Sequence, residues 1–380
     1  MNTVDAFTAL LRCAVTGSNE KIDLGEADPE LLYTMSKAHD LAHLVFYELK
    51  RLGITLPDEV QQKFKKQYDI ALYRHVKRTV TTEQIRAALE RAKIPFVLLK
   101  GSVLLNLYPE AWMRTSSDVD VLVREADHKR AAEAFKEIGW KTLHESPHDL
   151  FLVTPSGFSV ELHHTLIEEN RYPRVVSLLK RVWEYASPKE GLFEHELNDE
   201  FFFYYHIAHM VKHFENGGCG LRPIVDLWML DHRTEHDREK RFGMLETGGI
   251  ARFAEIMEEL SEIWLSGKEK DPSLNDVEEY IINGGAFGTF EHSVVVKRNK
   301  AANGFTYYLR RLFLPYDQLR CIYPILKKCP ILLPFCWIAR WFRLLNPNVR
   351  KRTISEIGIA ESAGSEAERI GAIMKQLGIS

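Results

Sequence analysis

The sequence predicts a mixed α/β core between two helical regions, and three patterns carry that prediction. Residues 1–92 repeat apolar side chains at helical spacing and hold few strand signals. Residues 93–170 alternate short apolar strands with helices, and helical spacing dominates again after Pro173. We therefore expect an N-terminal helical domain over 1–92, an α/β core over 93–170 and a C-terminal helical domain over 171–380.

The N-terminal region is expected to be helical because its apolar residues recur three and four positions apart. Leu41, Leu44 and Val45 mark one such face. Pro57 then precedes a long polar helix that is expected to run through Glu90. The strand signals begin only after this helix.

The core begins with two apolar runs that carry the main chemical signal. The first run, 94–99, is followed by Lys100 and Gly101-Ser102, and the second run, 118–123, contains Asp118-Val119-Asp120. Side chains two apart on a strand point to the same face, so Asp118 and Asp120 lie side by side while the intervening valines enter the core. Close carboxylates repel each other unless a divalent cation lies between them, so this face predicts a metal site.

A predicted β-hairpin supplies a third carboxylate. Apolar runs at 149–154 and 158–163 flank the turn Pro155-Ser156-Gly157. On the second strand Glu161 and His163 share one face, and Val160 and Leu162 take the other. We expect a neighbouring strand to present Glu161 to the ions held by the two aspartates. Carboxylate oxygens suit Mg²⁺ or Mn²⁺ rather than zinc.

This combination resembles the nucleotidyltransferase superfamily that includes DNA polymerase β and the aminoglycoside nucleotidyltransferases. It is more similar still to a bacterial branch of uncharacterised nucleotidyltransferases, sometimes grouped as family 5. The similar segments are Leu99-Lys100-Gly101, Tyr108-Pro109, Arg114, 117–123, Gly139-Trp140 and 160–163, with further stretches at 39–49, 209–214, 222–227 and 313–343. The chain departs from the usual superfamily motif in its long gap before Asp-x-Asp and in Lys100.

The resemblance implies an α/β nucleotidyltransferase core and metal-dependent transfer of a nucleoside monophosphate from a nucleoside triphosphate. ATP is the expected donor, an unidentified hydroxyl the acceptor and pyrophosphate the leaving group. Asp118, Asp120 and Glu161 are the implied catalytic residues and metal ligands. Transfer of a phosphoryl group by the same metal geometry stays open.

Four residues around the Gly-Ser turn are expected to contact the nucleotide. Gly101 and Ser102 begin a strand-to-helix turn, which offers backbone N–H groups to a triphosphate. Arg114 is a candidate phosphate clamp, and the alternative is a surface ion pair with Glu110. Lys100 either reaches a triphosphate oxygen or lies at the strand end as a solvated lysine.

Further polar residues are assigned only to a cleft near the site. His206, His209 and His213 share a helix face, but seven residues span about 10 Å of helix axis, which is too far for one ion. Core or interface roles are favoured for these histidines over roles in a cleft, and metal binding comes last. Arg222 and Asp226 are expected to form an ordinary i,i+4 ion pair or to position the acceptor. His163 is left open between phosphate contact and general-base catalysis.

The composition limits the remaining function classes. The chain has 380 residues, of which 45% are hydrophobic and 27% charged, so it can bury a large core. Five cysteines without a Cys-x-x-Cys motif, and no basic leader before an apolar stretch, predict a cytoplasmic protein without a disulfide framework. A net charge of −3 gives no global basic field, so no nucleic-acid partner is expected.

The apolar stretch 323–345 is interrupted by charges and prolines, so it is expected to form core helices. It cannot span a bilayer, and peripheral membrane contact is not expected despite a basic rim that includes Arg340 and Arg343. The acceptor, the base preference and the oligomeric state stay open.

Two alternative functions belong to other classes. A non-catalytic nucleotide-binding regulatory module would lack a working acid, whereas all three acids are present. A metal-dependent phosphohydrolase is suggested by His39-Asp40 and His206, but such a site needs a histidine upstream of His39, and the sequence has none there.

Overall fold

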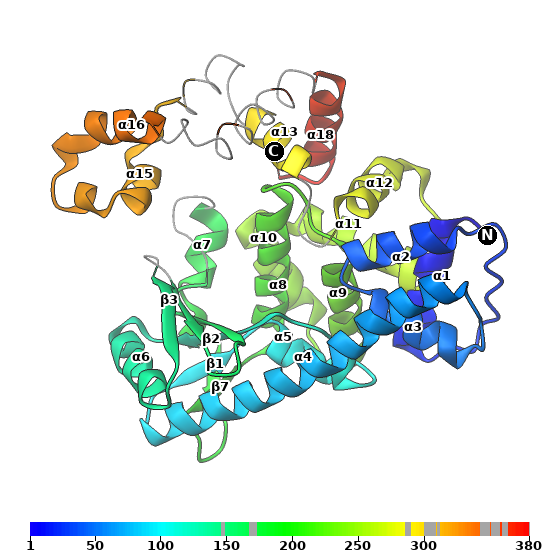
Figure 1. Ribbon diagram of the computed structural model, residues 1–380, viewed down its shortest axis with the longest axis horizontal. Coiled ribbons are helices and arrows are strands. Elements are labelled where there is room, and N and C mark those ends of the chain that lie inside the picture. Colours follow the sequence, from blue (N-terminus) through cyan, green and yellow to red (C-terminus); the bar gives the residue numbers. More distant parts are fainter. Residues whose placement is uncertain are drawn as a thin grey trace. The chain divides into compact units, whose positions relative to one another are not determined.

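The computed structural model describes residues 1–145, 149–166, 173–285, 290–299, 312–342 and 364–379, together with residues 309, 350 and 358 (Figure 1). The chain divides into two compact units. The first comprises 1–211 and 220–286, and the second comprises 212–219 and 287–380. The finer division into 1–92, 93–170 and 171–380 stays a prediction.

A seven-stranded mixed sheet forms the core of the first unit, with strand order β3-β4-β5-β2-β1-β7-β6. Its strands are β1 (Phe96–Leu98), β2 (Asp118–Val123), β3 (Lys141–Glu145), β4 (Asp149–Val153), β5 (Ser159–His163), β6 (Ala186–Pro188) and β7 (Glu194–Leu197). β2 runs parallel to β5, and β1 runs parallel to β7, whereas the other neighbours are antiparallel. The expected α/β class and the β4–β5 hairpin are confirmed.

One face of the sheet is apolar and packs on helices α4 (Asp58–Arg91) and α6 (His128–Glu137) (Figure 1). Val119, Val121 and Val160 point into this core and are fully buried. Burial of each such side chain stabilises the fold by about 1.5–3 kcal/mol. Because side chains alternate along a strand, this packing directs Asp118 and Asp120 to the opposite face.

Helices precede the sheet, as expected from the sequence. They are α1 (Thr3–Thr16), α2 (Pro29–Ala38), α3 (Ala42–Arg51) and α4. Asp28 caps α2 because its side chain accepts hydrogen bonds from the backbone N–H groups of Glu30 and Leu31. With 34 residues, α4 is about 51 Å long and runs from the N-terminal helices along the sheet (Figure 1).

The rest of the first unit is largely helical, and His39 ties it to the N-terminal helices. The helices are α5 (Gly101–Leu104), α7 (Pro173–Leu179), α8 (Asp199–Phe214), α9 (Leu221–Arg233), α10 (Arg238–Gly248), α11 (Ala251–Ser261) and α12 (Asn275–Gly284). Residues 212–214 at the end of α8 belong to the second unit. The backbone N–H of Leu221 donates to His39 Nδ1 at 3.1 Å, and His39 Nε2 donates to the Ile282 carbonyl at 2.9 Å. Burial lowers the pKa of His39 to about 4, so the ring is neutral at physiological pH.

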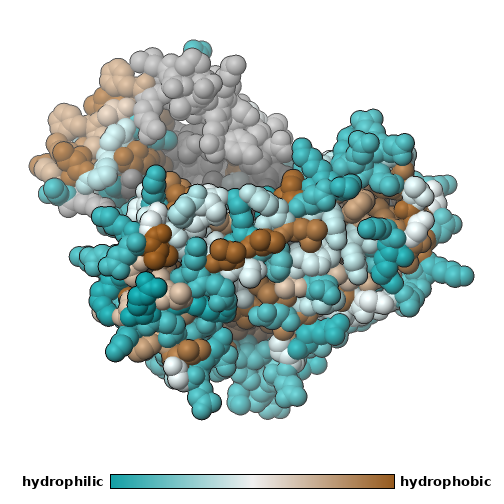
Figure 2. All heavy atoms as spheres, turned by 60° about the horizontal axis from the view of Figure 1, so that its bottom comes forward, coloured by the Kyte–Doolittle hydropathy of each residue, from teal (hydrophilic) through white to brown (hydrophobic). Residues whose placement is uncertain are grey.

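The second unit contains helices α13 (Phe290–Asn299), α15 (Tyr316–Ile322), α16 (Leu333–Phe342) and α18 (Gly364–Gln376). Leu319, Leu326 and Cys336 form a small buried cluster between α15 and α16. Brown, apolar atoms gather on the outside of the same segment (Figure 2). Within the described residues, none of the helices combines the length and the apolar character that crossing a membrane requires.

Candidate active site

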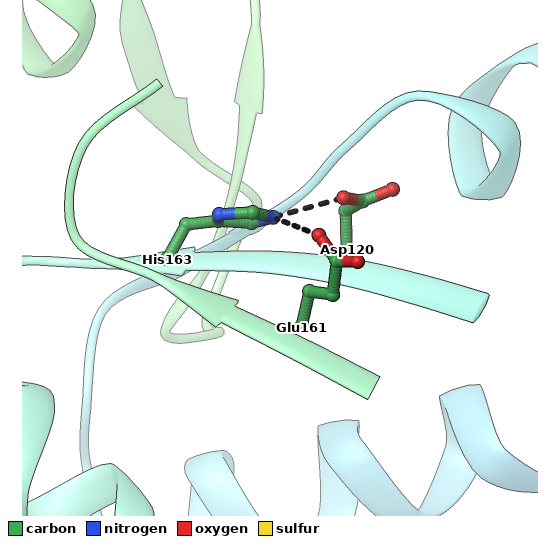
Figure 3. A group of neighbouring side chains, drawn as sticks. All are labelled: Asp120, Glu161 and His163. Carbon is green, nitrogen blue, oxygen red and sulfur yellow. Dashed lines mark hydrogen bonds and ion pairs between the residues drawn. The ribbon is translucent and has the colours of Figure 1, made fainter. Parts of the chain in front are cut away.

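The parallel register of β2 and β5 brings two carboxylates and an imidazole together on the face of the sheet that lies opposite the apolar core. Asp120 lies directly opposite Glu161, and His163 follows two residues later on the same face of β5. His163 Nε2 lies 2.8 Å from Asp120 Oδ1 and 3.4 Å from Glu161 Oε2 (Figure 3). Potential ligand atoms of the three residues lie within 4.8 Å of one another. In the described part of the chain, this is the one group of three or more side chains with such metal-binding geometry.

His163 is held in place from both sides of its ring. Nδ1 lies 2.5 Å from Asp149 Oδ1 on β4, and Nε2 contacts Asp120. Burial lowers the pKa of His163, but the hydrogen bonds to Asp120 and Asp149 outweigh burial and raise the pKa to about 9. Both ring nitrogens therefore donate at neutral pH. Asp149 was not among the residues expected at the site.

Lys100 is a second positively charged partner of Asp120, in addition to His163. Its Nζ donates to Asp120 Oδ1 at 2.6 Å, and its backbone has φ +46°, a conformation that residues other than glycine rarely adopt. Although burial opposes ionisation of Asp120, Lys100 and His163 hold its pKa well below the usual range. For the neighbouring Glu161, burial and the charge of Asp120 raise the pKa. The structure therefore places Lys100 at a carboxylate, which neither sequence-based alternative foresaw.

Asp118 precedes Asp120 by two residues on β2 and does not belong to the group of Asp120, Glu161 and His163. Its Oδ1 accepts a hydrogen bond from Ser116 Oγ at 2.7 Å. Ser116 in turn adjoins the Gly-Ser turn, because a Cβ atom at Gly101 would lie 3.4 Å from Ser116 Cβ. The buried Ser102 Oγ has no hydrogen-bond partner within the described structure. The turn and the Asp-x-Asp strand therefore meet at this point, as the sequence pattern suggested.

Arg114 is buried beside the Gly-Ser turn and pairs with Asp226 of α9. Its Nε donates to Asp226 Oδ1 at 2.7 Å, and its Nη1 donates to the Thr115 carbonyl. The Tyr108 hydroxyl donates to the same Asp226 oxygen at 2.8 Å. The suggested surface pair of Arg114 with Glu110 is therefore wrong, because Arg114 faces the interior.

The expected ion pair between Arg222 and Asp226 does not form in the described structure, where each residue has another partner. Arg222 Nη1 donates to Asp40 Oδ2 at 2.6 Å. The Thr115 hydroxyl donates to the same Asp40 oxygen at 2.9 Å. The helical spacing of Arg222 and Asp226 permitted a pair, but contacts with distant segments determined the partners.

Arg78 is a buried residue of this network that the sequence analysis missed. It lies in the middle of α4 and is only 2% exposed. Its guanidinium donates to the carbonyls of Arg114, at 2.6 Å, and Ala111, at 3.1 Å. Burial lowers the pKa of Arg78 to about 10, so it remains charged at neutral pH. No pattern in the polar sequence of α4 distinguishes this arginine from its solvated neighbours.

Helix α8 contributes Tyr205, which the sequence analysis also missed. Tyr205 is buried, and burial raises the pKa of its hydroxyl, with further effects from the charges of Lys100 and Asp120. The next residue, His206, is also buried and its Nε2 donates to the Pro223 carbonyl at 2.8 Å. His209 lies beside Tyr205, with 6.3 Å between ring centroids. Neither His209 nor His213 belongs to a metal-binding group of the described residues.

The phosphohydrolase alternative finds no support at His39-Asp40. Both ring nitrogens of His39 bond to backbone groups, and Asp40 accepts hydrogen bonds from Thr115 and Arg222. These contacts occupy both side chains, of which His39 is buried and Asp40 is partly exposed. Within the described residues they form no metal-binding group.

Comparison with known proteins gives one result that agrees with this geometry. A family model described as "Uncharacterised nucleotidyltransferase" matches residues 25–266, which include the whole sheet and helices α2 to α11. No match was found among curated proteins or among solved structures. The similar stretch at 313–343 lies outside the matched residues. Because the match spans most of the chain and the whole candidate site, the protein belongs to this uncharacterised nucleotidyltransferase family.

Proposed function

We propose that the protein transfers a nucleoside monophosphate from ATP to an acceptor hydroxyl and releases pyrophosphate. The observation that carries the proposal is the cluster of Asp120, Glu161 and His163 across the parallel strands β2 and β5. Membership in the nucleotidyltransferase family supports the reaction class. The adjoining Gly-Ser turn supports a nucleotide site beside the carboxylates, since Ser102 there has a buried hydroxyl without a partner in the described structure.

The side chains of the cluster fit a divalent cation. Asp120 and Glu161 offer the carboxylate oxygens that Mg²⁺ and Mn²⁺ prefer. Mn²⁺ also accepts an imidazole, and His163 would have to release its Nε2 proton to serve as that ligand. Asp149 would orient His163, as carboxylates commonly do for histidine ligands. Asp118 would supply a further carboxylate from the same strand. When bound, a divalent cation would make the acceptor hydroxyl more acidic and offset negative charge at the transferred phosphorus.

Lys100 is proposed to serve the leaving pyrophosphate. Its Nζ already reaches the site from the residue before Gly101, and its side chain is 26% exposed, so it can change partners. A triphosphate against Gly101 and Ser102 would bring anionic oxygens within reach of that ammonium group. Stabilisation of the leaving group by a positioned cation lowers the barrier to transfer.

Arg114 is proposed to position the site rather than to clamp phosphate. Its guanidinium is occupied by Asp226 and the Thr115 carbonyl, and its own carbonyl accepts from Arg78. These bonds hold the segment that leads into Asp118. Arg114 would therefore act through the geometry of the Asp-x-Asp strand.

The experiment that tests the proposal uses ATP labelled at the α- or the γ-phosphorus. The full-length protein is incubated with each label, Mg²⁺ and cell extract, and labelled products are identified by mass spectrometry. Nucleotidyl transfer predicts that the acceptor gains label from α-labelled ATP only, because the γ-phosphorus leaves in pyrophosphate. Asp120→Asn should abolish labelling, whereas Glu125→Gln, an exposed acid just after β2, should leave it unchanged.

Two results would contradict the proposal. An acceptor that gains the γ-phosphorus only when the protein is added to the extract would identify a phosphotransferase. Equal labelling by the wild type and Asp120→Asn would place the chemistry elsewhere.

A further inference from the structure

The C-terminal part of the chain differs in charge from the remainder. Residues 309–352 contain ten basic side chains and a single acidic one, Asp317, a net charge of +9. The whole chain carries −3, so the remaining residues carry −12. The basic residues are Arg310, Arg311, Arg320, Lys327, Lys328, Arg340, Arg343, Arg350, Lys351 and Arg352. This segment lies beyond the residues that match the family, so its properties are not part of the common transferase core.

The same segment exposes an unusual number of large apolar side chains. Nine of the seventeen exposed large apolar residues in the described structure lie between 309 and 342. Ile331 is 81% exposed, Phe335 67% and Phe342 66%. Together with Ile322, Ile325 and Ile338, these residues define what we call the α15–α16 surface, where Figure 2 shows apolar atoms gathered. Apolar patches of this kind mark interaction sites in soluble proteins.

The local packing explains why these residues remain outside. Trp337 Nε1 donates to the Leu314 carbonyl at 2.9 Å, and Trp341 Nε1 donates to the Leu312 carbonyl at 3.0 Å. These bonds fasten one side of α16 to the chain before α15. The small cluster of Leu319, Leu326 and Cys336 fills the space between the helices. The isoleucines and phenylalanines of the α15–α16 surface are not part of this cluster and stay exposed.

Charge and length together point to one kind of partner. A second copy would bring together two segments that each carry a net charge of +9, which disfavours self-association. With ten residues, α16 is about 15 Å long, half of the roughly 30 Å hydrocarbon layer, so it can lie in a membrane surface but not cross it. Apolar and aromatic side chains bordered by lysine and arginine are typical of segments that bind the headgroup region of anionic membranes.

We propose that the α15–α16 surface binds the surface of a membrane that contains anionic lipids. Ile331, Phe335 and Phe342 enter the boundary between headgroups and acyl chains, and the exposed Lys328 contacts lipid phosphates. The sequence alone did not lead us to expect this contact, although it showed a basic rim that includes Arg340 and Arg343. Exposure of the apolar residues is a tertiary property. The proposal is independent of the transferase reaction.

The test measures sedimentation of the full-length protein with lipid vesicles. Vesicles enriched in phosphatidylglycerol should bind at least about tenfold more tightly than pure phosphatidylcholine vesicles, and added salt should weaken binding. Phe335→Ser and Ile331→Ser should each reduce binding about tenfold, because each removes a large apolar side chain from the interface. Lys328→Gln, at an exposed position, should reduce it about fivefold, the equivalent of about 1 kcal/mol for one basic residue.

Matched substitutions on α4 provide the control. Tyr73 and Val76 are each 60% exposed, so Tyr73→Ser and Val76→Ser remove similar apolar area and should leave vesicle binding unchanged. Thermal unfolding of every variant checks the fold. Ile331 is the most exposed of the set, so Ile331→Ser tests the surface even if Phe335→Ser unfolds.

Three results would overturn the proposal. Vesicle binding that is unchanged in both Phe335→Ser and Ile331→Ser would exclude the α15–α16 surface as the membrane-binding site. A concentration-dependent dimer that is lost in Phe335→Ser would identify an interface between copies of the chain. Equal binding of the wild type and Phe335→Ser to a soluble polyanion, without vesicle binding by either, would identify a simple electrostatic surface.

Discussion

Two buried aspartates of this protein have similar partners but differ in what those partners can do. Asp120 Oδ1 accepts from Lys100 and His163, and Asp226 Oδ1 accepts from Arg114 and Tyr108. The partners of Asp226 are buried, and Arg114 also bonds to the backbone. Among the partners of Asp120, by contrast, Lys100 is partly exposed and has an unfavourable backbone conformation.

The ion pair of Asp226 is fixed and stabilises the fold, whereas Asp120 has a partner, Lys100, that can exchange it for another group. The removal of one member of a fixed, buried ion pair leaves the other charge without compensation and destabilises a protein by about 3–5 kcal/mol. Lys100 can turn towards water when its partner is removed, so the same loss costs less at Asp120. The two sites should therefore respond oppositely in activity and in stability.

The largest expected effect is on activity, at Asp120. Asp120→Asn should reduce nucleotidyl transfer by about 10³-fold or more, since it removes the carboxylate shared by the whole cluster. The free energy of unfolding should fall less than in Asp226→Ala, because Lys100 can reach solvent and His163 keeps Asp149 as a partner. Initial rates at saturating Mg²⁺, with Glu125→Gln as the control, check this expectation. A near-normal rate in Asp120→Asn would show that the two aspartates do not differ in function.

The second prediction concerns stability at Asp226. Asp226→Ala should lower the free energy of unfolding by about 3–5 kcal/mol, because Arg114 is then buried without its counter-ion. Urea unfolding provides the measurement. Asp69→Ala, which breaks an exposed pair with Lys65, should cost less than about 1 kcal/mol. If the two variants prove equally stable, the Arg114–Asp226 pair does not hold the structure together.

A third prediction extends the comparison to His39, a buried group that must stay neutral. The folded-state pKa of His39 is about 4, below the ordinary value of 6.5, so the unfolded chain binds the proton first as the pH falls. His39 should therefore cost the protein about 2 kcal/mol of stability between pH 7 and pH 5.

The measurement is the free energy of unfolding at both pH values in the wild type and in His39→Asn. Between pH 7 and pH 5, the free energy of unfolding of the variant should fall by about 2 kcal/mol less than that of the wild type. His144→Asn, at an exposed position of β3, should retain it. An unchanged pH dependence in His39→Asn would mean that His39 accommodates the proton in the folded protein.

The smallest expected effect is at Lys100, where two substitutions separate backbone from charge. Both Lys100→Gly and Lys100→Met remove the ammonium group, but only glycine adopts φ +46° without strain. Lys100→Gly should therefore be more stable than Lys100→Met by about 1 kcal/mol. Calorimetry with a non-hydrolysable ATP analogue should show equal losses of affinity in both. Equal stability of the two variants would remove the argument from backbone strain.

Local sequence patterns were sufficient for much of the fold. The spacing of apolar residues predicted helices in the N-terminal region, and alternation predicted β2 and the β4–β5 hairpin. The same alternation placed Asp118 and Asp120 on one face of β2, and it placed Glu161 and His163 on one face of β5. β3, β6 and β7 were not predicted, because these strands are short or polar and β3 is exposed throughout.

By itself, therefore, the sequence determined which face of each strand carries acids, because that choice depends only on alternation along the chain. Only the tertiary structure decided which acids meet, since the register of β2 against β5 joins Asp120 to Glu161 and leaves Asp118 with Ser116. It also decided the partners of Lys100, Arg78 and Asp226. The physical reason is that a hydrogen bond between residues far apart in sequence depends on how distant elements pack, which local periodicity does not encode.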